Sequence, residues 1–271
     1  MSEPDAAGAL DLAESLVLLT LGDLAIEGRL VDASNATMFC TVTLDGTSAG
    51  CVYKPVRGER PLWDFPDGTL AGREVSAYLV SEAAGWGLIP PTVLRDGPLG
   101  PGMCQLWIET GSIDGLVDIV RPGRVPGGWH PILDGMDGNG REVVVAHADD
   151  DRLRRLAVLD LVVNNADRKG GHLLLDSAGA LYGVDHGICF HSEDKVRTLL
   201  WGWAGQRLSA GEREVLTGLA AGMSGDLGEA LHEHLTRREV TATRRRIEAL
   251  LRSGCFPEPG PGRPRVPWPP F

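Results

Sequence analysis

Runs of β-branched and aromatic residues, separated by turn-forming residues, follow a short amphipathic stretch at 10–21. The runs LAIEGRLV, TMFCTVTL and AGCVYKPV each predict a β-strand, and Asp45-Gly46 between the last two is a preferred pair for a tight hairpin turn. A helix is predicted over 71–84, and MCQLWIE predicts a further short strand. Residues 24–109 therefore predict an antiparallel sheet with one helix, which together form a small α+β lobe.

A second set of periodic segments begins near residue 148, where an apolar stripe of helical spacing follows an acidic start, DDD. The members of the stripe are Leu153, Leu156, Ala157, Leu159, Asp160, Leu161 and Val163. The strings HLLLD and ALYGVD predict a β-hairpin across the turn SAG. Residues 208–251 predict further helices. The second half of the chain is therefore expected to be mainly helical.

Glycine and proline mark the parts of the chain with no clear period. Residues 110–142 are rich in both, and the tail at 257–271 is Pro-rich and expected to be extended, either as a docked arm or as a flexible end. We therefore expect an N-terminal nucleotide-binding lobe at 1–109, a C-terminal catalytic lobe at 110–256 and a Pro-rich tail.

Composition restricts the partners and the compartment. The sequence has 37 acidic against 26 basic residues, a formal charge of -11, which argues against a nucleic-acid partner. Five widely spaced cysteines without a C-x-x-C pair are typical of buried thiols in a reducing compartment. The acidic N-terminus differs from a signal peptide, and no apolar run approaches the roughly 18 residues of a membrane span. We expect a cytoplasmic protein without a transmembrane segment.

Two carboxylates stand out in NNADRKGGHLLLDSAGALYGVDHG, residues 164–187. Asp167 lies in a loop after an apolar helix, and Asp185 follows the second strand of the predicted hairpin. Phosphoryl transfer needs one carboxylate to orient the attacking hydroxyl and another to hold the metal that bridges the phosphates. In the same loop, Arg168 would neutralise charge near Asp167.

The predicted N-terminal lobe supplies groups for a nucleotide. Lys54 ends a strand and Glu74 lies in the first turn of the following helix, and a strand lysine paired with a helix glutamate holds the α- and β-phosphates in kinases. The turn DASNAT would cover the phosphates with the backbone amides of Ser34 and Asn35. The strand QLWIE would be the hinge for adenine. Its expected contact residues are Gln105, Trp107, Ile108 and Glu109.

Together these motifs resemble the phosphatidylinositol 3- and 4-kinase superfamily, and in particular its type II phosphatidylinositol 4-kinase branch with its bacterial relatives. The similarity to HipA-type toxin kinases is more distant. The matching pieces are VYKP, REVSAYLVSEAAGWGLIPPT, CQLWIE, NADRKGGHLLL and YGVDHGICF, over about residues 30–191. The resemblance implies an α+β, two-lobed protein-kinase-like fold with ATP in the cleft and Mg²⁺ or Mn²⁺ as the metal. It makes Asp167 the catalytic carboxylate and Asp185 a metal ligand.

One position departs from that family, because His172 stands where an asparagine usually provides a second metal ligand. Imidazole suits Mn²⁺ or Zn²⁺ better than Mg²⁺. Either the second metal is lost, or the preferred ion shifts, or Asn164 or Asn165 takes the ligand position. A rival register, from Asp160 to Asn165, has the D-x-x-x-x-N spacing of protein kinases, but Asp160 falls inside the predicted helix.

The expected function is therefore an ATP- and metal-dependent kinase. The acceptor hydroxyl belongs to a lipid, a protein or a small metabolite, and an acidic chain without a membrane segment would need a local basic patch to reach an anionic bilayer. Two alternatives stay open. One is a nucleotide-binding pseudokinase, suggested by His172 and by the glycine-poor loop, and the other is a nucleotidyltransferase that uses the same cleft.

Overall fold

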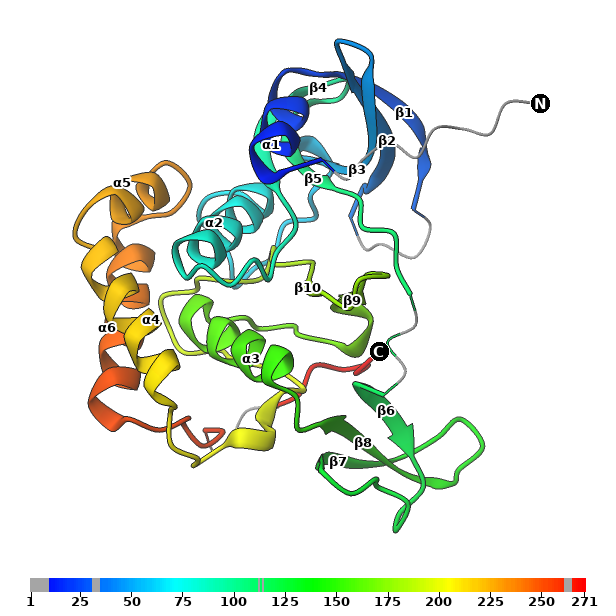
Figure 1. Ribbon diagram of the computed structural model, residues 1–271, viewed down its shortest axis with the longest axis vertical. Helices are drawn as coiled ribbons and strands as arrows, with labels where there is room; N and C mark the ends of the chain where they lie inside the picture. Colours follow the sequence, from blue (N-terminus) through cyan, green and yellow to red (C-terminus); the bar gives the residue numbers. More distant parts are fainter. Residues whose placement is uncertain (1–9, 31–34, 112, 114, 261–264) are drawn as a thin grey trace. The chain divides into compact units, whose positions relative to one another are not determined.

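The protein is described by a computed structural model that covers residues 10–30, 35–111, 113, 115–260 and 265–271. The chain forms two compact units, one of Met1–Arg60 with Pro91–Trp107 and the other of Pro61–Pro90 with Ile108–Phe271. The first is built on a small antiparallel sheet and the second is mainly helical (Figure 1). The predicted α+β fold class is confirmed.

The sheet of the first unit has the strand order β1-β2-β3-β5-β4, and all of its neighbouring strands are antiparallel. Its strands are β1 (Asp23–Arg29), β2 (Met38–Leu44), β3 (Thr47–Pro55), β4 (Thr92–Gly97) and β5 (Gly100–Leu106). Asp45 and Gly46 both have positive φ, 49° and 84°, as the predicted tight hairpin turn requires. The pattern did not indicate β4, because TVLRDG follows two prolines and mixes apolar with charged residues.

Helix α1 (Leu12–Leu21) covers one face of this sheet (Figure 1). A capping box starts it, with Glu14 N donating to Asp11 Oδ1 at 2.8 Å and Asp11 N to Glu14 Oε2 at 3.0 Å. Leucine side chains of the helix pack on a buried cluster that contains the thiols of Cys40, Cys51 and Cys104. The thiols are unbridged, and burial raises the pKa of Cys40 to about 11, so it is a packed thiol rather than a nucleophile.

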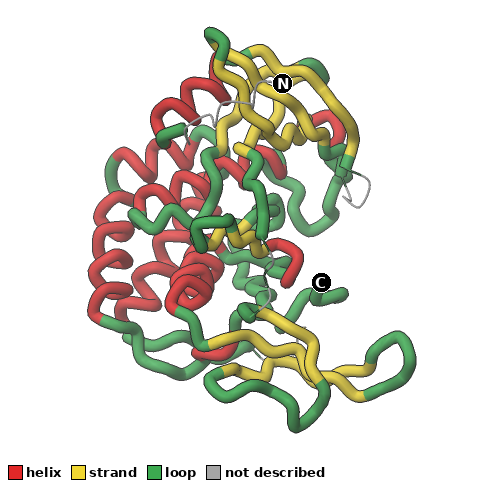
Figure 2. Tube along the Cα trace, turned by 45° about the vertical axis from the view of Figure 1, so that its right-hand side comes forward, coloured by secondary structure: helices red, strands yellow, loops and turns green. Residues whose placement is uncertain are grey.

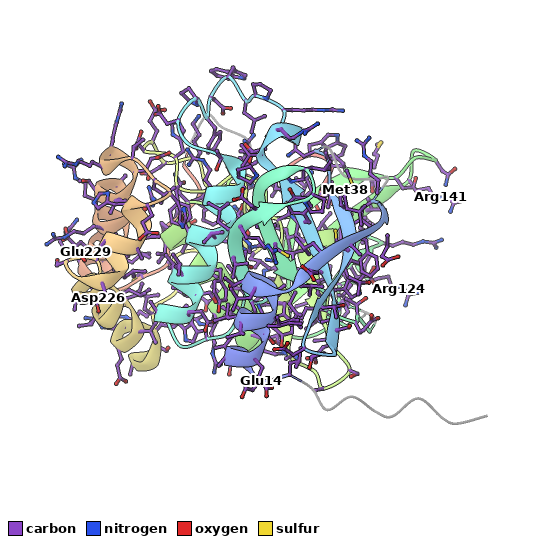
Figure 3. The ribbon with its side chains drawn as sticks, turned by 90° about the horizontal axis from the view of Figure 1, so that it is seen from above. Glu14, Met38, Arg124, Arg141, Asp226 and Glu229 are labelled. Carbon is purple, nitrogen blue, oxygen red and sulfur yellow. The ribbon has the colours of Figure 1, made fainter. Side chains whose placement is uncertain are left out.

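The second unit contains five α-helices within its described residues, gathered on one side of that unit (Figure 2). They are α2 (Leu70–Ala83), α3 (Asp151–Val163), α4 (Ala210–Gly222), α5 (Asp226–His232) and α6 (Arg237–Ser253). Helix α2 is buried over most of its length, and α3 begins where Asp150 accepts from the backbone N–H of Arg152 at 2.8 Å. Asp226 and Glu229 are exposed in the first turn of α5 (Figure 3), where acidic side chains favour the helix dipole.

Two small sheets complete this unit. The predicted hairpin is confirmed as β9 (Leu173–Leu175) and β10 (Leu181–Gly183). A three-stranded antiparallel sheet, β6 (Val117–Val120), β7 (Trp129–Met136) and β8 (Glu142–Ala148), has the order β6-β8-β7. The pattern missed it because proline and glycine interrupt β7, which pairs with β8 through a register shift at Pro131.

Within the Pro-rich tail, the described residues 265–271 are docked on the rest of the second unit. Thr198 N donates to Arg265 O at 3.1 Å, and Gly170 N donates to Pro270 O at 2.8 Å. The ring of Phe271 lies so close to Gly170 that a Cβ at that position would clash with a ring carbon. Of the two alternatives for the tail, the docked arm is therefore correct for these residues. Among the described helices, none combines the length and hydropathy that crossing a bilayer requires.

His147 on β8 gives the second unit a specific acid sensitivity. Its buried ring accepts a hydrogen bond from Gly202 N at Nε2 (3.1 Å) while Nδ1 donates to its neighbour Ala148 O (2.8 Å), so both nitrogens are used by the neutral ring. Burial lowers the pKa of His147 from 6.5 to about 4. Between these values the unfolded chain binds a proton that the folded chain does not, so stability is present above pH 6.5 and is lost as pH falls toward 4.

We expect His147 alone to remove about 3 kcal/mol from the free energy of unfolding over that interval. Urea unfolding at several pH values measures the loss, and His147→Gln should flatten the curve between pH 6.5 and 4 because glutamine does not titrate. Equal pH dependence of the two proteins would contradict the prediction.

Candidate active site

A buried ion pair lies at the base of the candidate site. Asp160, near the end of α3, and Arg168, in the loop after it, both have 0% side-chain exposure. Arg168 Nη2 lies 3.0 Å from Asp160 Oδ1, and Arg168 Nε reaches both carboxylate oxygens at 3.2 and 3.1 Å. Asp160 also accepts from Asn165 Nδ2 at 3.0 Å and Thr198 Oγ1 at 3.1 Å. The carboxylate is thus fully hydrogen-bonded, as a buried charge must be.

The other side of the Arg168 guanidinium joins the loop of Asp167 to the turn that carries Asp185. Arg168 Nη1 donates to Val184 O at 3.0 Å and to His172 O at 3.3 Å, and Nη2 contacts His186 Nε2. Because residue 183 is glycine, the backbone there can approach the Arg168 guanidinium closely: a Cβ at this position would lie 3.1 Å from Arg168 Nη2. One arginine therefore contacts both neighbours of Asp185, Val184 through its carbonyl oxygen and His186 through its ring.

This position corrects the expected role of Arg168. The sequence suggested that it neutralises charge near Asp167, but its guanidinium is buried against Asp160 instead. The cation beside Asp167 is Lys169, whose Nζ lies 3.3 Å from Asp167 Oδ2. The physical reason is that an arginine with several donors can satisfy a buried carboxylate and neighbouring carbonyls at once, whereas the flexible lysine stays at the partly exposed carboxylate.

Asp167 is held by its backbone and is partly buried. Asp167 N donates to Asn165 Oδ1 at 2.9 Å, which orients the start of the loop. Burial raises the pKa of the Asp167 carboxyl, and the charge of Asp185 raises it further, while Lys169 and Arg197 act in the opposite direction. Asp167 and Asp185 are therefore close enough to interact electrostatically.

Asp185 sits in a left-handed turn that packs against two other predicted residues. Its φ is 60°, and its side chain is 51% exposed. Asp185 Oδ2 lies 3.4 Å from His172 Nε2. The next backbone amide, His186 N, donates to Glu74 Oε2 at 2.8 Å, and Glu74 is buried on α2. The structure thus brings Asp185, His172 and Glu74 to one turn, although Glu74 was predicted for its pairing with Lys54.

The two asparagines considered as alternatives to His172, Asn164 and Asn165, are hydrogen-bonded elsewhere. Asn164 is the C-cap of α3 and has a φ of 55°. Its side-chain amide binds the backbone of the 191–195 segment. Nδ2 donates to the carbonyls at 191 and 193 (2.8 and 2.7 Å), and Oδ1 accepts from the N–H at 195 (2.8 Å). Asn165 is held by Asp160 and Asp167. These bonds oppose the alternative in which either asparagine moves to a metal, and they leave His172 as the neighbour of Asp185.

Three predicted phosphate-binding residues belong to the first unit. Lys54 is half-buried on β3, and its pairing with Glu74 stays a prediction. Asn35 Oδ1 accepts from Arg60 N at 3.0 Å, which ties the loop after β1 to the end of the segment following β3. Ser34 lies outside the described residues.

The predicted adenine-binding residues begin at the end of β5. Gln105 is buried, and its Nε2 donates to Thr92 Oγ1 at 2.8 Å, so its side chain is used inside the sheet. Trp107 N donates to Gly50 O at 3.0 Å, which removes one of the backbone donors expected for adenine. The remaining two are Ile108, half-buried, and Glu109, exposed. Their contact with a nucleotide stays a prediction.

Sequence reasoning set aside the residue that organises the site. Asp160 is a member of the predicted helical stripe and of the rival D-x-x-x-x-N spacing, which is discounted because Asp160 falls inside a helix, and it does lie inside α3. The signal available was a lone carboxylate within the apolar run LAVLDLVV, because a charge there must find a buried partner. Lys169 and Arg197 do not lie within an apolar run, so the sequence did not indicate a role for either of them.

Removing one member of the Asp160–Arg168 pair should be strongly destabilising. Arg168→Gln leaves Asp160 buried without its cation, and we expect a loss of about 3–5 kcal/mol in the free energy of unfolding, measured by urea denaturation. The matched control is Arg244→Gln on α6, whose partner Glu248 lies 2.9 Å away in an exposed i,i+4 pair. That control should cost under about 1 kcal/mol. Similar losses in the two variants would show that the buried pair has no special role.

Comparison with known proteins places this geometry in context. No family model matches the chain. Among solved structures, the chain is similar to the Golgi casein kinase, with a TM-score of 0.54 and 16% identity over 89% of this chain and 73% of that chain. It also matches the Helicobacter pylori proinflammatory kinase CtkA, with a TM-score of 0.41 and 9% identity over 88% of this chain and 94% of that one. The first of these likenesses establishes a kinase-like fold.

A curated protein of Mycobacterium tuberculosis, Protein Rv2133c, is 51% identical over 263 residues, which cover 94% of each chain. Identity at this level over nearly the whole length means that the chain belongs to the same family as Protein Rv2133c.

Proposed function

We propose that the chain is an ATP- and metal-dependent phosphotransferase that acts on an alcohol group. The observation that carries the proposal is the double attachment of Arg168, which holds the loop of Asp167 through Asp160 and the turn of Asp185 through Val184 O. With both backbone segments held in this way, Asp167 would orient the attacking hydroxyl and Asp185 would bind the metal, the two roles that phosphoryl transfer requires. The kinase-like fold and the motif likeness to phosphatidylinositol 3- and 4-kinases support the same reaction.

In the proposed step, the acceptor hydroxyl is oriented by the Asp167 carboxylate and loses its proton to it. The hydroxyl oxygen forms a bond to the γ-phosphorus of ATP, the bond from that phosphorus to the β–γ bridging oxygen breaks, and its electron pair leaves with ADP. Burial raises the pKa of Asp167, which makes the carboxylate a better proton acceptor than an exposed aspartate. Lys169, 3.3 Å from Asp167 Oδ2, limits that shift.

The residues at the Asp185 turn fit a metal that arrives with a nucleotide. Asp185 and His172 are adjacent donors, and within the described residues no group of three His, Cys, Asp or Glu side chains could hold a metal alone. Mg²⁺ typically binds through one or two carboxylates plus substrate phosphates, and an imidazole ligand favours Mn²⁺. The ion would neutralise charge on the bridged phosphates.

Two further residues belong to the proposal by their sequence pattern. Lys54 would hold the α- and β-phosphates, as a strand lysine does in kinases. Glu74, hydrogen-bonded to the amide of His186, would link α2 to the metal-binding turn. Any change in the position of α2 would then be transmitted to Asp185.

The proposal is tested by ADP formation from ATP with Mg²⁺ or Mn²⁺. Asp167→Asn and Asp185→Asn should each lower the rate by about 100-fold or more, because one removes the proton acceptor and the other a metal ligand. The control is Asp134→Asn, an exposed aspartate on β7 of the same unit, which should keep the wild-type rate. Circular dichroism checks that all three variants are folded. A wild-type protein that forms no ADP with either metal, or equal rates in all variants, refutes the proposal.

A further inference from the structure

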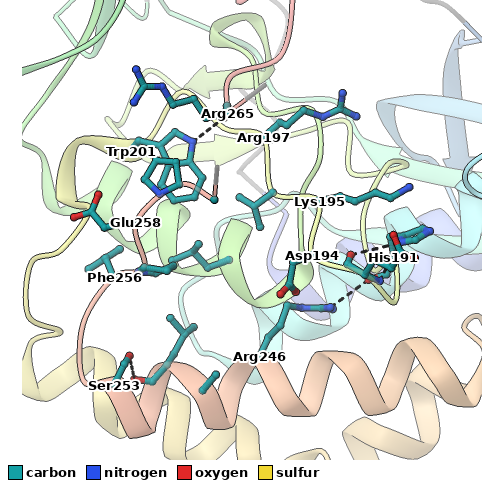
Figure 4. Close-up of a pocket in the computed structure, with 18 of the residues that line it drawn as sticks. His191, Asp194, Lys195, Arg197, Trp201, Arg246, Ser253, Phe256, Glu258 and Arg265 are labelled. Atoms are coloured by element: carbon teal, nitrogen blue, oxygen red, sulfur yellow. Dashed lines mark hydrogen bonds between the residues drawn. The ribbon is translucent and has the colours of Figure 1, made fainter. Parts of the chain in front are cut away.

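Residues 265–271, which we call the arm, are attached at their first residue to a neighbouring segment of the second unit. Arg265 O accepts from Thr198 N at 3.1 Å and from Trp201 Nε1 at 2.7 Å. The bond to Trp201 lies in the wall of a cavity (Figure 4). Thr198 forms a parallel bridge with Arg168, whose guanidinium lies at the base of the candidate site. The start of the arm is therefore one segment away from the loop of that site.

The other end of the arm contacts this loop directly. Pro270 O accepts from Gly170 N at 2.8 Å, and the ring of Phe271 lies where a Cβ of residue 170 would be. Gly170 begins a 3₁₀ helix that ends at His172, and the first N–H groups of a helix have no partner inside it. Lys169, the N-cap, forms no side-chain hydrogen bond to this helix. The arm therefore supplies the cap that the local sequence lacks.

The two-glycine link, residues 170–171, joins the cation and the imidazole of the candidate site. Lys169 precedes the link, and its Nζ lies 3.3 Å from Asp167 Oδ2. His172 follows the link, and its Nε2 lies 3.4 Å from Asp185 Oδ2. Glycine restricts the backbone less than any other residue, so the link has little rigidity of its own. Its shape therefore depends on what holds it from outside.

We propose that the arm is a positioning element of the candidate active site, in which Pro270 and Phe271 hold the two-glycine link. A fixed link keeps the lysine beside Asp167 and the histidine beside Asp185. Phe271 acts through the backbone of the link and is therefore a positioning residue rather than a catalytic one. This inference rests on the proposed phosphotransferase function, because the two carboxylates are those assigned to proton transfer and metal binding.

The contact itself is tested without reference to activity, by NMR measurement of hydrogen exchange at the amide of residue 170. This amide should be protected in the wild-type protein because Pro270 O accepts from it. Phe271→Ala should raise its exchange rate about tenfold or more, since the end of the arm then opens more often. The control is Trp268→Ala, in the same arm, which removes a side chain that is 77% exposed and should leave the exchange rate unchanged. Equal exchange in the wild type and in Phe271→Ala overturns the proposal.

A matched pair of alanine substitutions tests whether the ring of Phe271 covers the link. Neither Gly170 nor Gly171 has a positive φ, so alanine suits the backbone at both positions. Gly170→Ala places a methyl group where the ring lies and should expose the amide of residue 170. Gly171→Ala should leave that amide protected, because no atom beyond its chain neighbours lies within 4 Å of the added Cβ.

The double variant completes this test. In the Phe271→Ala background the ring is already absent, so adding Gly170→Ala should produce no further loss of protection. Additive losses in the double variant, or equal effects of Gly170→Ala and Gly171→Ala, would contradict the proposed contact.

Positioning is tested by the kcat of ADP formation from ATP with Mn²⁺. Phe271→Ala should lower kcat about tenfold, because small displacements of reacting groups slow the chemical step. Phe271→Leu keeps an apolar side chain over the link and should retain most of the wild-type rate, and Trp268→Ala should retain all of it. Urea unfolding checks that each variant is fully folded under the assay conditions.

The possible failures are distinguishable. An active wild-type protein whose kcat is unchanged in Phe271→Ala overturns the positioning role, and so does a higher kcat, which would make the arm an inhibitor. If the wild-type protein forms no ADP with Mg²⁺ or Mn²⁺, the phosphotransferase function fails together with the role of the arm in it. Hydrogen exchange at residue 170 still decides in that case whether the arm holds the loop.

Discussion

The buried ion pair between Asp160 and Arg168 is the constraint on which the candidate site depends. Two charges without solvent exposure cost several kcal/mol each to desolvate, and the cost is offset only because every oxygen and most donors of the pair have partners. Those partners lie in the loop of Asp167 and in the turn of Asp185, and one is the hydroxyl of Thr198. The energetic need to satisfy one buried carboxylate therefore determines where two partly exposed carboxylates stand.

The same principle extends to α2 and to the segment behind the site. Glu74 is buried and accepts from His186 N, so the turn of Asp185 is held by α2 as well as by Arg168. Hydrogen bonds of Asn164 and Arg197 join the 191–197 segment to the end of α3 and to the loop of Asp167. Each group that would contact substrate is thus oriented by a buried group that would not, which is how a site on loops obtains fixed geometry.

The sequence predicted the elements with strong local signals. The first three strands, the hairpin at Asp45-Gly46, α2, α3 and β9–β10 follow from turn residues, caps and period, all of which act within a few residues. It failed for β6, β7 and β8, because strands interrupted by glycine and proline are stabilised by pairing across the sheet rather than by local propensity. It also placed Arg168 wrongly, since a loop arginine can turn either way and sequence spacing carries no direction.

By itself, the sequence predicts which residues carry chemistry and in what order: a strand lysine, a helix glutamate, and two aspartates, one in a loop and one in the turn after a strand. Residue type and spacing are sufficient for that, because the chemistry of a carboxylate is local. Only the tertiary structure decided the interaction partners of these groups. Asp167 forms an ion pair with Lys169, Asp160 forms one with Arg168, and Glu74 accepts a hydrogen bond from the backbone amide of His186. The contact between Glu74 and His186 joins segments that are distant in the chain. For Asp160 and Arg168, burial rather than sequence spacing determines which oppositely charged side chains form the ion pair.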